Sequence, residues 1–276
     1  MPTARANGID LYYERSGSGP PLLWLNGSGS TIAQVAPLLG PYTDRFEVLI
    51  HDQRGLGRTE VPAGPYTMAD YAADALALLD EVGWERPLAL GISFGGMVAQ
   101  ELAVTAPDRI ERLALLCTSP GGEGGSSYPL HELTALAPAD RARLHGKLLD
   151  IRFDDAWLAD HPNDQALVDL MGARPEPTEG ALLQLEARRD HDVWDRLDRV
   201  TCPTLVASGR YDGIAAPENG EAIASRIPDA ELRLFEGGHM FMVQDRSATR
   251  AVIEFLLDSD HGPEVTGEAT RRHSAT

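Results

Sequence analysis

The segment Pro87-Leu88-Ala89-Leu90-Gly91-Ile92-Ser93-Phe94-Gly95-Gly96-Met97 contains a serine in the pattern G-x-S-x-G. An apolar run precedes the serine and a helical pattern follows it. A serine at the tip of such a strand-to-helix turn has a strained backbone, and the residues two positions away must lack bulk. Its hydroxyl is exposed at the carboxyl edge of a sheet, where open α/β sheets bind ligands. The segment therefore predicts that Ser93 is a nucleophile.

The chain around this segment alternates between short apolar runs and amphipathic stretches. This alternation predicts an α/β fold with a mostly parallel sheet and helices on both faces. Apolar runs of strand type lie at 9–14, 22–25, 46–50, 88–91, 110–117, 204–208 and 231–235, and helical patterns lie at 68–82, 95–106, 217–226 and 247–257.

One region interrupts the alternation. Residues 119–199 contain no good strand, begin with the glycine-rich segment 121–125, and continue with amphipathic stretches. We expect a helical cap over residues 119–199, inserted into a core formed by residues 1–118 and 200–258. The polar tail, 259–276, is expected to be disordered.

A serine nucleophile requires a base to remove its proton and an acid to orient that base. His239 follows the last apolar run in Gly237-Gly238-His239, where two glycines allow the loop to bend. The expected chain order is serine, acid, histidine, which makes Asp212 the favoured acid because it follows the run 204–208. Glu123, after the preceding strand, is the alternative acid.

Acyl transfer passes through an oxyanion that needs fixed hydrogen-bond donors. We predict that the backbone N–H of Phe94 is one donor. The second is expected in the loop Asn26-Gly27-Ser28-Gly29-Ser30, with the N–H of Ser28 as the candidate.

Several motifs in this order resemble the α/β-hydrolase superfamily from about residue 7 to residue 257. Besides Gly91–Gly95, the segment Asp52-Gln53-Arg54-Gly55-Leu56-Gly57-Arg58-Thr59 is similar to the family's D-x-R-G-x-G-x-S segment. The resemblance implies an eight-stranded sheet, a helical cap after the sixth strand at 110–117, and a structural role for Asp52 and Arg54. The branch it resembles most contains small esterases, enol-lactonases and cofactor-free haloperoxidases. One departure is Asn26, where the family pattern has a histidine that braces the loop.

These features predict a serine hydrolase that cleaves a small or medium carboxylic ester or lactone through an acyl-enzyme. One alternative is a C–C bond hydrolase or a cofactor-free haloperoxidase or perhydrolase on the same fold. An alternative of another class is a ligand-binding homologue that has lost turnover.

The composition narrows the range of partners. The chain has 276 residues and a net charge of -18, which disfavours binding to nucleic acid and to anionic membrane surfaces. No metal or cofactor motif is present, so we expect neither. Cys117 and Cys202 are expected to be buried free thiols. No apolar leader or spanning stretch is apparent, which favours the cytoplasm. The sequence leaves the oligomeric state open.

The cap and the histidine loop provide large apolar side chains for a substrate pocket. Phe153, Trp157, Met240 and Phe241 are the candidates, although aromatic residues of the cap could equally seat it on the sheet. An anionic substrate would need a buried arginine. The spacing of the cap arginines predicts solvated helix faces for all six of them: Arg141, Arg143, Arg152, Arg174, Arg188 and Arg189.

Overall fold

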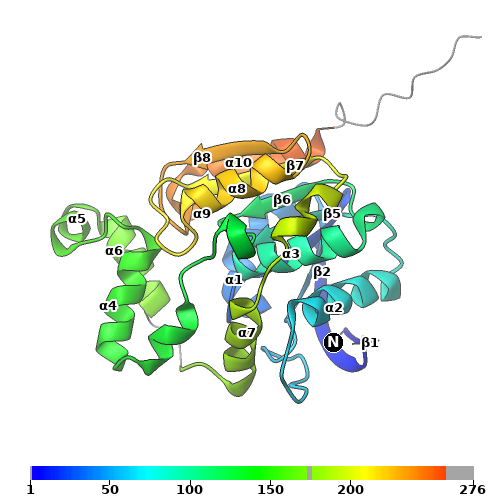
Figure 1. The fold of residues 1–276 in the computed structure, drawn as a ribbon, viewed down its shortest axis with the longest axis horizontal. Helices are drawn as coiled ribbons and strands as arrows, with labels where there is room; N and C mark the ends of the chain where they lie inside the picture. Colours follow the sequence, from blue (N-terminus) through cyan, green and yellow to red (C-terminus); the bar gives the residue numbers. More distant parts are fainter. Residues whose placement is uncertain (1, 173–175, 259–276) are drawn as a thin grey trace, which may run out of the picture.

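The computed structural model describes residues 2–172 and 176–258. The expected tail, 259–276, and Arg174 therefore lie outside the described residues. In this part of the chain, eight strands form one sheet with helices on both faces (Figure 1). The strands are β1 (Thr3–Ala6), β2 (Ile9–Gly17), β3 (Pro21–Leu25), β4 (Glu47–His51), β5 (Leu88–Ile92), β6 (Leu113–Leu116), β7 (Thr204–Gly209) and β8 (Glu231–Phe235).

The sheet has the order β1-β2-β4-β3-β5-β6-β7-β8. β1 pairs antiparallel with β2, and β2 pairs antiparallel with β4, whereas all later pairs are parallel. The predicted mostly parallel α/β sheet is thus confirmed. Strands β3 to β7 are almost wholly buried, which explains their continuous apolar sequences.

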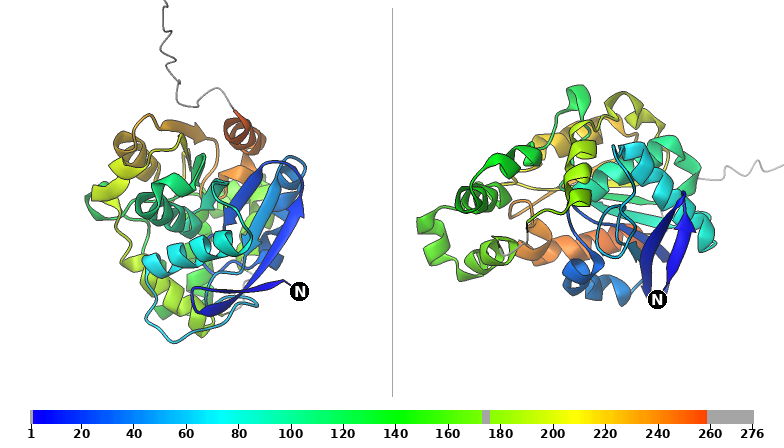
Figure 2. Two further views of the ribbon diagram at one scale, coloured as in Figure 1. Left: turned by 90° about the vertical axis from the view of Figure 1, so that its right-hand side faces the viewer. Right: turned by 90° about the horizontal axis from the view of Figure 1, so that it is seen from below.

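Two apolar layers hold the helices against the sheet. One layer joins α2 (Met68–Glu81), α3 (Phe94–Thr105) and α8 (Pro217–Arg226) to one face. The other joins α1 (Ile32–Thr43), α9 (Phe241–Gln244) and α10 (Arg246–Leu257) to the opposite face. Figure 2 shows this layered arrangement from two further sides. Cys117 and Cys202 are buried free thiols, as expected.

The chain between β6 and β7 is helical and forms a separate layer beside the core (Figure 1). Its α-helices are α4 (Pro138–Leu149), α5 (Asp155–Asp160), α6 (Pro162–Gly172) and α7 (Glu179–Arg189). Short 3-10 helices occupy Pro107–Arg109, Gly122–Gly124, Leu130–Ala135 and Trp194–Arg199, the last three of them between β6 and β7. The described residues of this segment form only an isolated bridge, between Gly121 and Asp192, where the segment leaves and rejoins the core.

Candidate active site

Ser93 lies at the turn between β5 and α3 with φ 54° and ψ -115°. Its N–H donates to the Leu116 carbonyl at 2.8 Å, and its carbonyl accepts the Thr118 hydroxyl at 2.9 Å. These bonds to the end of β6 hold the serine in a backbone conformation that L-residues rarely adopt.

The glycines beside Ser93 allow the close approach that this turn requires. A Cβ built on Gly95 would lie 2.1 Å from the Leu25 carbonyl oxygen, and one built on Gly91 would lie 2.4 Å from the carbonyl oxygen of Gly95. Both distances are far below a normal contact, so larger residues would separate α3 from the sheet. The two glycines of the motif are thus explained by backbone packing.

Three side chains from separate loops form one hydrogen-bonded chain. His239 Nε2 lies 3.0 Å from Ser93 Oγ, and His239 Nδ1 lies 2.8 Å from Asp212 Oδ2. Ser93, His239 and Asp212 are all buried. Such an arrangement can transfer the serine proton to the imidazole while the carboxylate orients the ring.

Asp212 is fixed by its own loop as well as by the histidine. Its Oδ1 accepts the N–H groups of Ile214 and Ala215, each at 2.8 Å. The alternative acid, Glu123, is exposed in the 3-10 helix Gly122–Gly124. The structure therefore joins Asp212, and not Glu123, to His239.

Backbone bonds connect the end of α4 to both loops. The N–H of His239 donates to the Leu149 carbonyl at 2.6 Å, and the N–H of Gly213 donates to the Leu148 carbonyl at 3.1 Å. In return, the N–H of Ile151 donates to the Tyr211 carbonyl at 2.9 Å. The segment between β6 and β7 is thus hydrogen-bonded to the chain on both sides of Asp212 and at His239.

The 26–30 loop, which contains the second expected oxyanion donor, passes beside the serine. A Cβ built on Gly27 would lie 3.6 Å from the Ser93 Cβ. Within the loop, the N–H of Ser30 donates to the Gly27 carbonyl at 3.2 Å. Phe94 is the first residue of α3, where backbone N–H groups have no partner within the helix.

Asn26, the departure from the family pattern, braces this loop through different contacts. Its Oδ1 accepts the Trp24 indole N–H at 2.8 Å, and its backbone carbonyl accepts Nε2 of Gln53 at 2.9 Å. The Asn26 side chain is 1% exposed. The asparagine therefore ties the loop to β3 and to the segment after β4.

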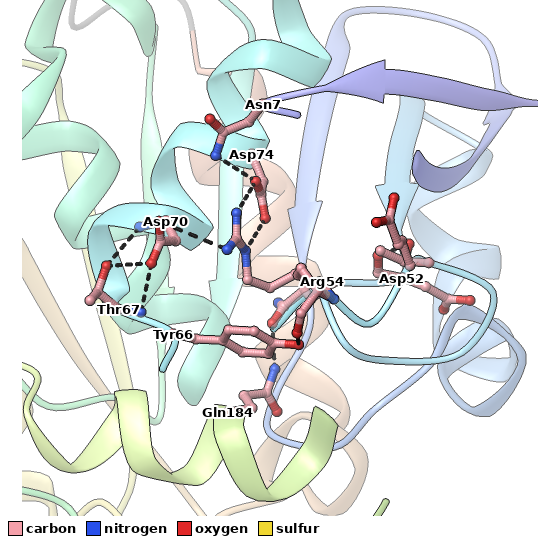
Figure 3. Close-up of polar contacts among 12 residues, drawn as sticks. Asn7, Asp52, Arg54, Tyr66, Thr67, Asp70, Asp74 and Gln184 are labelled. Carbon is pink, nitrogen blue, oxygen red and sulfur yellow. Dashed lines mark hydrogen bonds and ion pairs between the residues drawn. The ribbon is translucent and has the colours of Figure 1, made fainter. Parts of the chain in front are cut away.

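The segment after β4 is in turn fixed by buried charge. Arg54 donates through Nε and Nη2 to the two carboxylate oxygens of Asp74, both at 2.6 Å, and Asn7 donates to the same carboxylate. Figure 3 shows this group, with Gln184 reaching from α7 toward the loop that carries Arg54. Asp52 accepts the N–H groups of Ile32 and Arg58. Both residues make the loop-tying contacts that the resemblance implied.

A cavity of about 610 Å³ lies between the 26–30 loop and the helices inserted after β6. Ser28 and Gly29 contribute to its wall on the core side. On the other side its lining is mostly apolar and includes Leu130, Leu133, Met171, Ala181 and Leu185. The cavity thus begins at the loop beside Ser93 and extends under the helical layer.

None of the four aromatic and methionine residues expected in a substrate pocket lines this first cavity. Phe241 is fully buried in the core and stacks on Phe235. Phe153 lines a second cavity of about 600 Å³ among the inserted helices. Met240 and Trp157 pack in an apolar cluster with Phe153, and Trp157 also stacks on His161. Apart from Ser28, Gly29 and Arg141, the residues that line the first cavity were not singled out in the sequence, because their proximity arises only from the fold.

The arginines of the inserted segment differ in how exposed they are and in which groups they contact. Arg143 is 89% exposed, as its spacing predicted, and Arg141 pairs with Glu176 at the first cavity. Arg188 was predicted wrongly: it is buried and donates to the Tyr128 carbonyl and to Ser127 Oγ. Burial lowers the pKa of Arg188 to about 10. The reason is that α7 packs its Gly180, Gln184 and Arg188 side inward.

Among the residues that the structure describes, no three or more His, Cys, Asp or Glu side chains are grouped as they would be around a metal ion. No described helix has the length and apolar character required to cross a bilayer.

Comparison with known proteins points to one family. The profile of the family described as alpha/beta hydrolase fold matches residues 20–245. The enol-lactonase from Burkholderia xenovorans LB400 superposes with a TM-score of 0.78, at 28% identity, over 93% of this chain and all of that one. A hydrolase from Pseudomonas aeruginosa PA01 superposes with a TM-score of 0.77, at 33% identity, over 93% of this chain and 98% of that one. The 3-oxoadipate enol-lactonase 2 of Acinetobacter baylyi is 25% identical over 92% of this chain and 96% of its own length.

Proposed function

Because the chain belongs to the alpha/beta hydrolase fold family and its relatives are hydrolases, we propose that it is a serine hydrolase of neutral carboxylic esters or lactones. The observation that carries this proposal is the chain of hydrogen bonds from Ser93 Oγ through His239 to Asp212, at 3.0 Å and 2.8 Å. A serine hydroxyl becomes nucleophilic when a neutral imidazole accepts its proton, and a buried carboxylate stabilises the imidazolium that forms.

The proposed reaction has two halves. Ser93 Oγ attacks the carbonyl carbon while His239 Nε2 takes the hydroxyl proton, and the carbonyl electron pair moves to the oxygen. When the tetrahedral intermediate collapses, the C–O bond to the leaving group breaks and His239 protonates the departing alcohol. A water molecule then gives its proton to His239 and attacks the acyl-enzyme, which releases the acid and restores Ser93. In a lactone, the departing alcohol stays attached to the acyl group.

The negative charge on the carbonyl oxygen requires donors that are in place before the reaction. We propose the backbone N–H groups of Phe94 and Ser28 for this role. Support comes from the start of α3 at Phe94 and from the course of the 26–30 loop beside the serine. The N-terminal end of α3 also favours negative charge at this position.

The cavity beside the 26–30 loop supports a neutral, largely apolar substrate. Apolar side chains make up most of its wall, and the guanidinium of Arg141 there is neutralised by Glu176. A volume of about 610 Å³ falls within the ordinary range of small-molecule sites. An ester or lactone of medium size would therefore be bound mainly by burial of its apolar surface.

The test is covalent labelling with a fluorophosphonate together with turnover of aryl esters. We expect the wild-type protein to be labelled and the Ser93→Ala variant to remain unlabelled, with kcat reduced by a factor on the order of 10⁴ or more. Labelling of the variant to the same extent as wild type would overturn the assignment of the nucleophile. Failure of the wild type to be labelled would instead favour a binding protein without turnover.

A further inference from the structure

A buried pair of glutamine side chains links α7 to the 26–30 loop. Gln184 has no exposed surface. Its Oε1 accepts the N–H of Gly29 at 2.7 Å, and its Nε2 donates to Oε1 of Gln53 at 2.8 Å. Gln53 Nε2 then donates to the Asn26 carbonyl at 2.9 Å. The two amides thus form a continuous chain of hydrogen bonds that runs from the Gly29 N–H to the Asn26 carbonyl.

The orientation of both amide groups follows from which of their partners can only donate and which can only accept a hydrogen bond. The Asn26 carbonyl can only accept, so Gln53 must direct its NH₂ group toward it. Gln53 Oε1 is then an acceptor, which requires the NH₂ group of Gln184. Gln184 Oε1 consequently faces the N–H of Gly29, which can only donate. Reversal of either amide would bury mismatched polar groups, and each unmade buried bond costs about 1–3 kcal/mol.

The two ends of the chain fall on either side of Ser28. Gln53 holds the peptide carbonyl of Asn26, and Gln184 holds the N–H of Gly29, while Ser30 holds the Gly27 carbonyl. These bonds constrain the peptide groups before and after Ser28. They therefore set the direction of the Ser28 N–H, which we propose as an oxyanion donor.

We infer that Gln184 is a positioning residue for the oxyanion hole, acting through Gly29 and together with Gln53. This inference rests on the proposed serine hydrolase function. It assigns a part in the chemistry to a residue of the inserted helices that touches no catalytic side chain in the described hydrogen bonds. Because an oxyanion donor contributes only when its direction is correct, a displaced Ser28 N–H would weaken binding of the transition state more than binding of the substrate.

The packing of α7 against the core does not depend on these two amides alone. The helix also packs closely at its start, where Gly180 lies against the backbone of Gly55, and further along, where Leu183 lies against Gly64. The hydrogen bonds of Gln184 are therefore not the only contacts that hold α7 against the core.

The experiment compares wild type with four single variants, Gln184→Leu, Gln184→Glu, Gln53→Leu and, as control, Leu183→Ala, and with the double variant that combines Gln53→Leu and Gln184→Leu. The control shortens a side chain of α7 that lies against Gly64 and removes no hydrogen bond to the 26–30 loop. Two readouts need no natural substrate: the rate constant of fluorophosphonate labelling and the affinity for phenylboronic acid, which forms a tetrahedral adduct on the serine. Melting temperatures are measured for every variant.

We expect Gln184→Leu to slow labelling by about 10- to 100-fold and to weaken phenylboronic acid binding by a similar factor, less than the loss seen when an oxyanion donor itself is removed. For an aryl ester, kcat should fall while KM changes by less than about threefold. Gln184→Glu keeps the acceptor for the Gly29 N–H, so its labelling rate and its affinity for phenylboronic acid should fall less than those of Gln184→Leu. Gln53→Leu should resemble Gln184→Leu, and the double variant should lose no more than the larger single loss, because both residues act in one chain.

Labelling of Gln184→Leu at the wild-type rate would overturn the inference. An equal slowing of labelling in Leu183→Ala would also overturn it, because the effect would then be explained by the packing of α7. Fully additive losses in the double variant would show that the two glutamines do not act together. Absence of labelling in wild type would overturn the proposed function itself, and this inference with it.

Discussion

At the scale of single residues, Asp212 uses its two carboxylate oxygens for two different sets of contacts. One oxygen accepts the imidazole of His239, and the other accepts two backbone N–H groups of its own loop. This division keeps the carboxylate in place when the histidine moves or changes protonation. Asp212 is thus held in a position from which it could orient His239, the proposed base, and its own loop holds it there without the histidine.

A substitution can separate these two functions. Asp212→Asn preserves the size of the side chain but can present an NH₂ group to Nδ1 of His239, which would favour the wrong tautomer. We expect kcat for an aryl ester to fall by roughly 10²- to 10⁴-fold, with the fold intact by circular dichroism. Glu123→Gln is the matched control and should change kcat by less than about twofold, because the exposed Glu123 side chain lies outside the hydrogen-bonded chain. The reverse ranking would move the acid to the end of β6.

The sequence selected three residues that the structure brings into one hydrogen-bonded group, but not the residues that surround them. Ser93, Asp212 and His239 each follow a strand within a short glycine-containing motif, so local patterns were sufficient to select them. Gln184 has no such motif, because its partners are Gln53 and Gly29, more than 100 residues away in the chain. Contacts of this kind depend on the packing of α7 and cannot be read from local periodicity.

At the scale of elements, one helix and one strand were also missed, because their local sequence patterns do not indicate them. α1 contains Pro37 and Pro41, which conceal a helical pattern that the structure nevertheless forms from Ile32 to Thr43. β1 is four residues long and includes two exposed positions, so its apolar content is too small to indicate a strand. By contrast, α2 and α8 have long amphipathic patterns, and their predicted bounds agree with the structure within one residue.

The contact between α7 and the loop after β4 provides a prediction at this scale. A Cβ built on Gly180 would lie 1.9 Å from the Gly55 carbonyl oxygen, so Gly180→Ala must push the helix away from the loop. We expect the free energy of unfolding to fall by about 1–3 kcal/mol, and labelling by a fluorophosphonate to slow. Urea denaturation measures the first effect.

Gly40 in α1 is the matched control for this experiment. A Cβ there would meet no atom within 4 Å, and its φ is not in the left-handed region. Gly40→Ala should leave stability unchanged or raise it by up to about 1 kcal/mol, as expected for alanine in a helix. Equal destabilisation by both substitutions would refute a specific contact at Gly180.

At the scale of the whole molecule, two buried histidines link stability to pH. These are His51, at the end of β4, and His191, near the point where the inserted segment returns to the core. Both are buried, and burial lowers the pKa of each to about 4. In the unfolded chain a histidine has a pKa of about 6.5. Between these two values the unfolded state binds more protons, so stability rises with pH and falls as the solution is acidified.

We therefore expect the free energy of unfolding to decrease as the pH falls from about 6.5 to about 4, by up to about 3 kcal/mol for each histidine. His191→Gln should remove part of this dependence. Urea denaturation at a series of pH values measures the slope. An unaltered slope in His191→Gln would contradict the linkage.

Substrate preference also belongs to the whole molecule, because the net charge of -18 and the wall of the cavity act together. An acidic surface slows the approach of anions, and an apolar wall binds a carboxylate poorly. We expect kcat/KM for a neutral aryl or alkyl ester to exceed that for a carboxylate-bearing lactone by at least about tenfold, equivalent to ~1.4 kcal/mol. Steady-state kinetics on matched pairs of substrates tests this.

A preference for the carboxylate-bearing lactone would contradict that expectation and would direct attention to Arg141, the arginine that lines the first cavity. In that case Arg141→Met should abolish the preference, whereas the exposed Arg143→Gln should not. The comparison would show whether the guanidinium in the cavity wall, rather than the surface charge, selects the substrate.

The attachment of α4 to the loops of Asp212 and His239 has a consequence for how such a protein diverges. The three bonds at Leu148, Leu149 and Ile151 join backbone to backbone, so they place few demands on the identity of any side chain. Mutations can therefore alter the helical wall of the cavity while the relative positions of Asp212 and His239 stay the same. A lineage that carries this junction can explore new substrates by point substitution. Transplanting the helices from a distant relative, however, would succeed only if the donor's backbone followed the same path across residues 148–151.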